Sequence, residues 1–206
     1  MAESTKTHWD MVYAQKTDDQ LSWHQDDPAV SLALIEKVDA TSASSVIDVG
    51  GGASRLVDCL LAKGFRDLTV LDLSQVALEN ARNRLGKTAD DVVWLCQDVT
   101  SWMPARSYDI WHDRAVFHFL VDQSDREKYV DHMVSALPIG GHAIIATFAP
   151  DGPSRCSGMP VVRYSPDELA DHLADNFEPM SHHSHMHYTP WGMGQSFQFS
   201  LFRRIR

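Results

Sequence analysis

The segment "VIDVGGGASRLVDCLLAKGF", Val46 to Phe65, constrains the fold of this chain more than any other stretch. It reads as a short apolar strand, then three successive glycines, then a helix whose apolar face carries Leu56, Cys59 and Leu60. Glycines between a strand and a helix allow a tight turn in which the backbone can approach a ligand closely. The segment therefore predicts the start of an α/β domain, in which this turn either binds a nucleotide or serves only as a connection.

The same alternation of strands and helices continues to Phe148. The stretches "LTVLDLS", "VVWLCQD", "YDIWHD" and "HAIIATF" predict four further strands with helical patterns among them. Strands that alternate with helices favour a parallel sheet covered by helices on both faces. Two closing strands are predicted in "FEPMSHHSHMHY" and "QSFQFSLFRR", joined by a Pro/Gly turn at 190–194.

Several helix starts can be read from local signals. Ser74 predicts an N-cap, and the pairs Ser124 with Glu127 and Ser165 with Glu168 each predict a capping box. The first forty or so residues predict a helical preface, with helices in "HWDMVY" and "DPAVSLALIEKV". A chain of 206 residues is long enough for one such α/β domain with a full core.

Composition excludes several classes of function. The net charge of −10 argues against a nucleic-acid partner, which requires a basic patch. No run of about eighteen apolar residues is present, so no membrane span is predicted. The N-terminus "MAESTKTHWD" lacks the layout of a signal peptide, and we expect a cytoplasmic protein. Cys59, Cys96 and Cys156 are odd in number and lack metal spacing, so neither a disulfide framework nor a metal site is predicted.

The glycines complete neither of two common nucleotide-binding patterns. Gly50 and Gly52 fill the first two positions of Gly-x-Gly-x-x-Gly, but Arg55 stands where dinucleotide-binding proteins have the third glycine. A phosphate-binding Gly-Lys-Ser/Thr ending is also absent from the sequence. The glycines alone are therefore weak support for a dinucleotide or a nucleoside triphosphate.

Three carboxylates near the predicted turn indicate a more specific ligand. Asp72 follows Gly52 by twenty positions at the end of the second strand, where it can accept hydrogen bonds from both ribose hydroxyls. Asp98 ends the third strand at the same sheet edge and can accept from an adenine amine. Asp48, in the first strand, can hold the turn or receive an ammonium. Together they repel a pyrophosphate and suit a ligand with adenosine, an ammonium and a sulfonium.

At these positions the sequence resembles the class I S-adenosylmethionine-dependent methyltransferases. The resemblance covers residues 46–148 and rests on "IDVGGGAS", "VLDLS", "CQDVT", "YDIWHDRAVFHFL" and "LPIGGHAIIATF". It implies an α/β, Rossmann-like fold with a seven-stranded, mostly parallel sheet of order 3-2-1-4-5-7-6, the last strand antiparallel, sandwiched by helices. It also implies one domain over 1–206, with a helical N-terminal cap (1–44), a cofactor-binding core (45–148) and a substrate loop with closing strands (149–206).

The resemblance also implies which residues hold S-adenosylmethionine. The expected contacts of the methionine part are Asp48, Gly50 and Gly52. The ribose is expected to contact Asp72 and the adenine Asp98, with Leu73 and Val99 beside the ring. "HWDMVYAQKTDDQLSWHQDDP" resembles the preface of a branch with protein-lysine and small-molecule S-methyltransferases, which covers the bound cofactor. The candidates for this cover are Trp9, Tyr13, Trp23 and Gln25, although the aromatic residues can equally pack a helix onto the sheet. The candidate cofactor-binding residues are Trp23, Asp48, Gly50, Gly52, Asp72, Leu73, Asp98, Val99 and Asp113.

The segment after the fourth strand is expected to line the acceptor pocket. Its candidate catalytic residues are Asp113, Arg114 and His118, with His118 as a general base. The alternative is an Asp113–Arg114 ion pair and a half-buried structural histidine. The loop 149–165 and the closing strands add candidate substrate-binding residues. These are Arg155, Cys156 (as a thiolate favoured by its neighbour), His187 and Trp191.

The sequence thus predicts an S-adenosylmethionine-dependent methyltransferase that acts on a small-molecule acceptor: a thiol, a metalloid, an amine or a carboxylate. A protein substrate, through protein-lysine methylation, is the alternative within this class. An NAD-dependent oxidoreductase and a non-catalytic cofactor-binding module remain alternatives of other classes. No nucleic-acid or membrane partner is expected, and the oligomeric state is not predicted. His183, His185 and His187 alternate along one predicted strand, either as metal ligands or as a histidine-rich rim.

Overall fold

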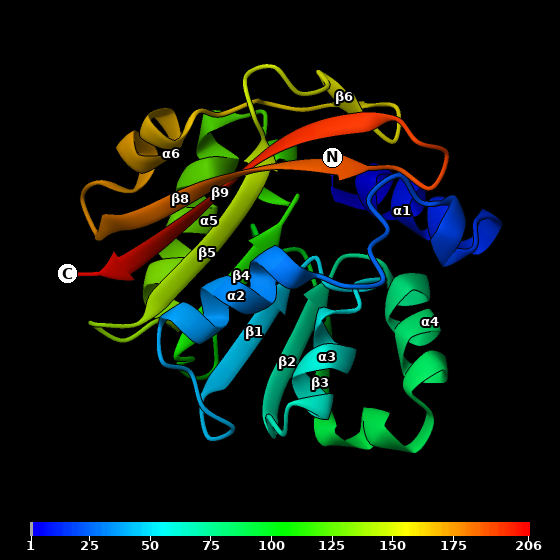
Figure 1. Ribbon diagram of the computed structural model, residues 1–206, viewed down its shortest axis with the longest axis horizontal. Coiled ribbons are helices and arrows are strands. Elements are labelled where there is room, and N and C mark those ends of the chain that lie inside the picture. The colour runs from blue at the N-terminus through cyan, green and yellow to red at the C-terminus, as the bar shows by residue number, and fades with distance from the viewer. Residues whose placement is uncertain (1) are drawn as a thin grey trace.

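A seven-stranded sheet of order β3-β2-β1-β4-β5-β9-β8 forms the centre of the molecule (Figure 1). The computed structural model describes residues 2–206, so residue 1 of the predicted preface lies outside the described part. β9 runs antiparallel to both of its neighbours, and the other strand pairs of the sheet are parallel. The predicted strand order and the antiparallel last strand are therefore confirmed. The strands are β1 (Ser45–Val49), β2 (Asp67–Asp72), β3 (Val92–Cys96), β4 (Ile110–Arg114), β5 (His142–Phe148), β8 (Phe177–Tyr188) and β9 (Gly194–Arg204).

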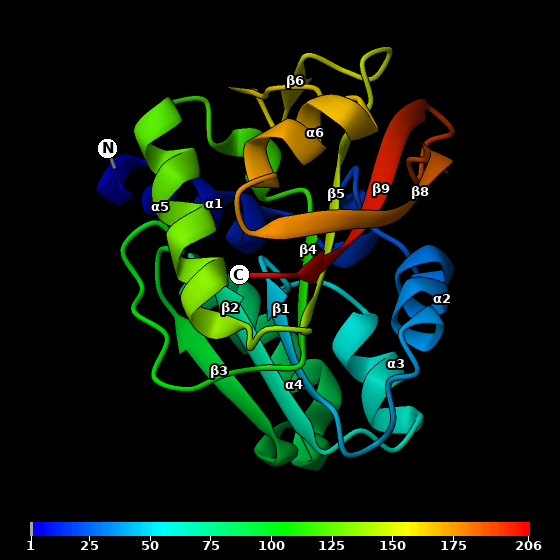
Figure 2. The same cartoon turned by 90° about the vertical axis from the view of Figure 1, so that its left-hand side faces the viewer.

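Helices cover both faces of this sheet. Figure 2 shows α5 on one side of the sheet and α2 with α3 on the other. The helices are α1 (Ala2–Gln15), α2 (Ala29–Lys37), α3 (Leu56–Ala62), α4 (Gln75–Leu85), α5 (Gln123–Ala136) and α6 (Pro166–Leu173), and the 3₁₀ turns are η1 (Asp18–Gln20), η2 (Gly86–Asp91) and η3 (Phe117–Phe119).

Two apolar cores follow from the alternation of side chains along the strands. On β1, Val46 packs with residues of α2, α3 and α4, whereas Ile47 packs with residues of α5 and α6 on the opposite face. Both side chains are fully buried. A strand buried on both faces is apolar throughout, which is why it stands out in the sequence as a continuous apolar run.

Two of the three predicted helix starts are confirmed. Ser74 accepts a hydrogen bond from the backbone N–H of Ala77, and Ser165 forms the predicted capping box with Glu168. The box predicted for Ser124 and Glu127 is wrong, because the N-cap of α5 is Asp122, two residues earlier, in an extended conformation. The Glu127 carboxylate instead accepts a hydrogen bond from the side chain of Gln123, one turn away.

The long loop after β5 contains a small antiparallel ribbon that the sequence analysis did not predict. It pairs β6 (Arg155–Cys156) with β7 (Met159–Pro160). Ser157 and Gly158 form its two-residue turn with φ of 48° and 79°, as hairpin turns with two left-handed residues require. The ribbon places alternate side chains of the loop on opposite faces.

The two predicted helices of the preface are α1, which lies over the carboxyl end of the sheet, and α2, which packs on one face of it (Figure 1). α1 is attached to α4 by polar contacts: the Ser74 hydroxyl donates to Asp10 over 2.6 Å, and the Asn80 amide donates to the carbonyl of Tyr13 over 3.3 Å. None of the described helices is both long enough and apolar enough to cross a membrane.

Candidate active site

The glycine turn after β1 requires its glycines. Gly50 has a φ of 69°, and a Cβ added there would lie 2.1 Å from Cγ2 of Val116. A Cβ on Gly52 would lie 2.7 Å from a carboxylate oxygen of Asp72. Both residues would therefore strain the turn if they carried a side chain. The turn is fixed against β2, because the N–H of Gly50 donates to the carbonyl of Leu71 over 2.7 Å.

A cavity of about 320 Å³ opens beyond the carboxyl ends of the parallel strands, next to this turn. That volume is in the range of small-molecule binding sites. The strand order reverses between β1 and β4, and ligands bind at this point in open α/β sheets. Two sides of the cavity can be distinguished. The β2–β3 side carries Asp72, Leu73, Asp98 and Val99, and the β4–β9 side carries Arg114, Phe148, Cys156, Met159, Pro160 and Phe197.

Two carboxylates on the β2–β3 side are held by local hydrogen bonds. Asp72 accepts from the N–H groups of Gly52 (3.0 Å) and Ser74 (2.7 Å). Burial raises the pKa of Asp72 to about 6. Asp98 accepts from the N–H and the hydroxyl of Thr100, over 2.9 and 2.7 Å. Each carboxylate is thereby fixed and still has lone pairs with which it can accept hydrogen bonds from a ligand.

Asp48 lies behind the glycine turn and does not line the main cavity. Its Oδ1 accepts a hydrogen bond from Nδ1 of His112 over 2.7 Å, and Nε2 of His112 is 2.8 Å from the hydroxyl of Ser31. Its Oδ2 is buried without a partner among the side chains described, 5–206. A small void beside Asp48 also touches Gly50 and Arg114. This buried chain of polar groups was missed by the sequence analysis, although Asp48 and His112 face each other in the β1–β4 register.

Aromatic side chains of the preface cover the cavity. Trp9, Tyr13 and Trp23 line it together with Phe119, and we call these four residues the aromatic cover. The ring of Trp9 lies 5.7 Å from that of Trp23 and 5.2 Å from that of Phe119, in edge-to-face contact. Gln25, also expected in the cover, lines the small void and an outer groove instead.

Asp113 does not line the cavity. Its carboxylate is fully buried and accepts from the N–H groups of Val116 (2.8 Å) and Phe117 (3.0 Å) and from the hydroxyl of Tyr129 (2.6 Å). Burial raises its pKa to about 6. The ion pair with Arg114, considered above, is not formed. Asp113 instead anchors the turn that follows β4.

His118 also lies outside the cavity, fully buried between the rings of Phe119 and Phe148 at 4.5 and 4.8 Å. Its Nδ1 accepts a hydrogen bond from the N–H of Phe148 over 3.3 Å. Burial lowers its pKa to about 3, so the imidazole is neutral and a poor acceptor of a further proton. The expected role of His118 as a general base therefore has no geometric support.

Arg114 and Cys156 line the cavity, but the partner of Arg114 and the protonation state of Cys156 differ from the expectation. Arg114 donates from Nη2 to the carbonyl of Trp23, and burial lowers its pKa to about 10, so it stays protonated at neutral pH. Burial raises the pKa of Cys156 to about 11, which keeps the thiol neutral. The expectation of a thiolate was wrong because Arg155 is exposed on the other face of β6 and donates to the carbonyl of Gly158.

The remaining substrate-binding candidates on the β8–β9 hairpin lie outside the cavity. His187 is buried and donates from Nε2 to the carbonyl of Ser22 over 2.7 Å, which connects β8 to the preface. Trp191 is 55% exposed near the hairpin turn. Within the part of the chain that the structure describes, no group of three or more His, Cys, Asp or Glu side chains is arranged to hold a metal ion.

The comparisons with known proteins agree with this geometry. Residues 46–141 match the model of the methyltransferase domain family. Over residues 46–141 this chain is therefore similar to the class I S-adenosylmethionine-dependent methyltransferases. The malonyl-[acyl-carrier protein] O-methyltransferase 1 of Ilyobacter polytropus is 27% identical to it over 106 residues, which are 50% of this chain and 38% of that protein's length.

Solved structures share the fold of this chain over nearly its whole length. An enzyme that converts a disulfide bond into a thioacetal group in echinomycin biosynthesis superposes with a TM-score of 0.77 at 20% identity, covering 97% of this chain and 93% of that one. The 1,6-didemethyltoxoflavin N1-methyltransferase of Burkholderia thailandensis, bound to its acceptor and S-adenosylhomocysteine, gives 0.70 at 20% identity, covering 98% and 85%.

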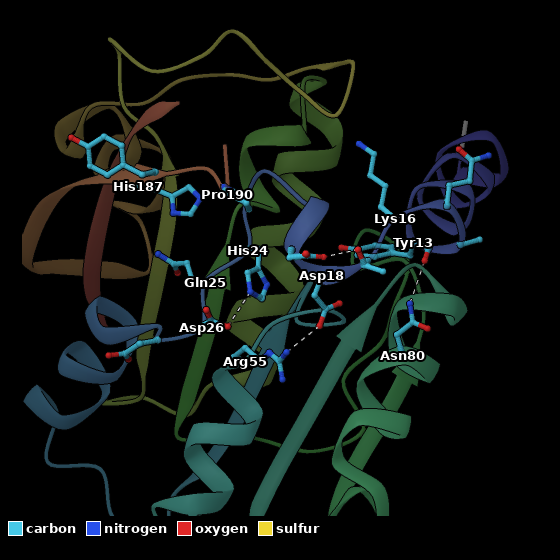
Figure 3. A pocket seen from close by; sticks show the side chains of 16 residues that line it. Tyr13, Lys16, Asp18, His24, Gln25, Asp26, Arg55, Asn80, His187 and Pro190 are labelled. Carbon is cyan, nitrogen blue, oxygen red and sulfur yellow. Dashed lines mark hydrogen bonds and ion pairs between the residues drawn. The ribbon is translucent and has the colours of Figure 1, made fainter. Parts of the chain in front are cut away.

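A second, wider concavity lies on the outer side of the molecule, beside the preface (Figure 3). This outer groove has a volume of about 1030 Å³ and shares Tyr13 with the cavity. Asp18 is neutralised within it by Arg55 (3.5 Å) and Arg84 (3.3 Å). Its remaining acidic residues are Asp19, Asp26 and Asp27.

The sequence patterns do not predict most of the apolar wall on the β4–β9 side. Phe148 and Phe197 face each other in the antiparallel β5–β9 register, with their rings 4.7 Å apart. Met159 and Pro160 reach the cavity from β7. A signal for the ribbon was present, because Ser157-Gly158 favours a two-residue hairpin turn, but nothing local indicates which face of it meets the cavity.

Proposed function

We propose that this chain uses S-adenosylmethionine to methylate a small-molecule acceptor. The observation that carries the proposal is the arrangement on the β2–β3 side. Two fixed carboxylates, Asp72 and Asp98, line the same cavity as a glycine turn that excludes side chains. A nucleoside with a positively charged sulfonium suits that electrostatic field.

The residues present fit this cofactor. Asp72 would accept from the ribose hydroxyls and Asp98 from the adenine amine, with Leu73 and Val99 beside the ring. The unpartnered Oδ2 of Asp48 is a buried acceptor that suits an ammonium group beside the glycine turn. When bound, S-adenosylmethionine supplies an electrophilic methyl group. The aromatic cover would exclude water from the reacting atoms.

The site fits less well with the two alternatives from other classes, an NAD-dependent oxidoreductase and a non-catalytic cofactor-binding module. A dinucleotide would bring a pyrophosphate toward the carboxylates of Asp72 and Asp98, and Arg55 is engaged with Asp18 in the outer groove rather than with the cavity. A non-catalytic module would use the same cofactor contacts, and turnover alone separates it from an enzyme.

Protein-lysine methylation is a second candidate function, and the outer groove favours it. Asp19, Asp26 and Asp27 leave this groove acidic, which suits a basic polypeptide segment. The covered cavity of about 320 Å³ favours a small acceptor instead. We rank the small acceptor first because the cavity, and not the groove, contains the carboxylates proposed for the cofactor.

The test measures donor binding and methyl transfer separately. We expect Asp72→Ala to weaken S-adenosylhomocysteine binding by about 10- to 100-fold in calorimetry, because it removes charge-assisted hydrogen bonds. Asp175→Ala, which removes an exposed carboxylate beyond α6, is the matched control and should leave binding unchanged. Release of S-adenosylhomocysteine from labelled donor, with thiol, carboxylate, metalloid and amine acceptors, tests for turnover. Uptake of NAD without affinity for S-adenosylhomocysteine would refute the proposal.

A further inference from the structure

Arg114 is the one positive charge that lines the cavity among the residues whose side chains are described, 5–206. Within the same range, no carboxylate lies within 4 Å of its guanidinium. One of its N–H groups donates to the carbonyl of Trp23, a neutral acceptor. A half-buried guanidinium with one neutral acceptor still has N–H groups free, so this one has capacity left for an anionic partner.

On the side that faces the cavity, the surroundings of Arg114 are apolar, whereas Asp48 borders the small void on its other side. Its Cζ lies 6.0 Å from the ring centroid of Phe197, and Phe148, Met159 and Pro160 complete the β4–β9 side of the cavity. Cys156 is beside them as a neutral thiol. Charge–charge attraction is stronger in such surroundings than in water. An anion placed beside this guanidinium would therefore be bound more tightly than at an exposed site.

Among the side chains that the structure describes, 5–206, the titratable groups in the cavity wall do not include a base on the β4–β9 side. They are Tyr13, Asp72, Asp98, Arg114, Asp125 and Cys156. Asp72 and Asp98 belong to the β2–β3 side, and Asp125 accepts from Lys128 over 3.1 Å at the start of α5. Burial raises the pKa of Tyr13 well above its usual value, so its phenol is not a base at neutral pH. An acceptor that must lose a proton during transfer therefore finds no assistance beside Arg114.

We propose that the acceptor is an anion at neutral pH, a thiolate or a carboxylate on an apolar body, and that Arg114 pairs with it on the β4–β9 side of the cavity. This inference rests on the proposed function. In the transfer, a bond forms from the anion's lone pair to the methyl carbon while the carbon–sulfur bond of the sulfonium breaks and leaves its electron pair on sulfur. Both reactants lose their charge, and no proton has to be removed.

The same geometry opposes an amine acceptor. A lysine or another amine would need a base to become neutral, and its methylated product would regain a positive charge near Arg114. The guanidinium would repel that charge in a site of low dielectric. The inference therefore favours small anionic acceptors over a lysine side chain that approaches from the outer groove.

Matched probes of similar shape test the charge of the acceptor. Thiophenol, benzoate, benzyl alcohol, benzylamine and a lysine-containing peptide are offered with labelled donor, and release of S-adenosylhomocysteine is followed. Binding of benzoate and thiophenol to the protein loaded with S-adenosylhomocysteine is measured by calorimetry, independently of turnover. We expect thiophenol or benzoate to bind and to be methylated, and the neutral and cationic probes to be inactive. Which of the two anions is methylated identifies the acceptor as a thiolate or a carboxylate.

Variants then test the role of Arg114. Arg114→Gln should lower kcat/KM for the anion by about 10- to 100-fold, because it removes a charge-assisted pair. Arg114→Lys, which keeps the charge, should recover part of the loss. Arg66→Gln changes an exposed arginine that follows α3 and lines neither the cavity nor the outer groove, and it is the control. S-adenosylhomocysteine should bind wild type and all three variants within about threefold, a difference of less than 1 kcal/mol.

Three results would overturn the inference. They are methylation of benzylamine or the peptide in preference to the anions, no binding of either anion to the loaded wild type, and a loss in Arg114→Gln of S-adenosylhomocysteine affinity rather than anion affinity. The last result would assign the guanidinium to the cofactor. If the wild type instead bound no S-adenosylhomocysteine, the proposed function itself would fail, so the two failures are distinguishable.

Discussion

The two sides of the cavity are built in different ways. On the β2–β3 side, Asp72 and Asp98 are each oriented by a backbone N–H group two residues later, of Ser74 and Thr100, and Asp72 also by that of Gly52 in the glycine turn after β1. On the β4–β9 side, aromatic rings and a single guanidinium come from β4, β5, the loop ribbon and β9. The negative and positive groups are thus separated within one cavity. Such a separation orients a ligand whose two ends differ in charge.

The largest effect is expected at Asp113, which anchors the turn after β4 and lies outside the cavity. Asp113→Ala leaves two backbone N–H groups and the Tyr129 hydroxyl without their acceptor, so we expect the free energy of unfolding to fall by about 3–5 kcal/mol. Urea denaturation measures the change. A variant of wild-type stability that lacks activity would show that Asp113 acts in the chemistry rather than as an anchor.

The β2–β3 side should respond to pH through Asp72. Its raised pKa of about 6 means that the protonated carboxyl, which has lost acceptor capacity, becomes dominant below that pH. We expect the affinity for S-adenosylhomocysteine to fall by up to about tenfold per pH unit below 6. Calorimetry between pH 5 and about 8 tests this, with Asp72→Asn as the variant that should bind weakly and without this pH dependence.

The same shift has a consequence for stability with a definite sign. Because the pKa in the folded protein lies above the usual value of 3.8, the folded state binds the proton more tightly than the unfolded chain does. The contribution of Asp72 to the stability of the free protein therefore falls as the pH rises from 3.8 to about 6. Asp72→Asn should remove that part of the decline in urea denaturation, and an unchanged decline would contradict the shift.

A smaller effect is expected at His118. Its neutral, buried imidazole lies outside the cavity, so His118→Gln should change kcat by less than about threefold, while costing about 1–2 kcal/mol of stability. The pH profile of kcat/KM should show no inflection that disappears in this variant. A loss of kcat by orders of magnitude in a folded variant would restore His118 as a base.

The smallest effect is expected on the rim of the hairpin. Trp191 is largely exposed and lines neither the cavity nor the outer groove. Trp191→Ala should alter kcat/KM for any acceptor by less than about twofold, within 0.5 kcal/mol. A large increase in KM would mean that the hairpin closes over the acceptor.

These contrasts also explain what the sequence could predict. The place of Asp72 and Asp98 in the cavity wall could be predicted because each ends an apolar strand, and parallel strands bring their carboxyl ends to one edge of a sheet; their cofactor contacts stay a prediction. The strand order followed from a resemblance carried by consecutive motifs. Residues predicted from local spacing, such as Ser74 and Ser165 as helix caps, were likewise confirmed.

The β4–β9 side depended on contacts that no local pattern contains. Cys156 was placed correctly in the cavity, yet its protonation was predicted wrongly, because the alternation of β6 turns Arg155 away and burial then dominates. His187 was read as a substrate contact, but its partner is the carbonyl of Ser22, which is 165 residues away. Long-range partners of this kind become visible only when the fold brings them together.

The aromatic cover has a practical consequence for observation in solution. Trp9 and Trp23 line the cavity with their rings 5.7 Å apart, whereas Trp102 and Trp111 are buried in the core and Trp191 faces solvent. Indole emission depends on the polarity around the ring. The molecule therefore carries an intrinsic fluorophore at its binding site, and the arrival of donor, product or acceptor can be read from its emission spectrum without a label.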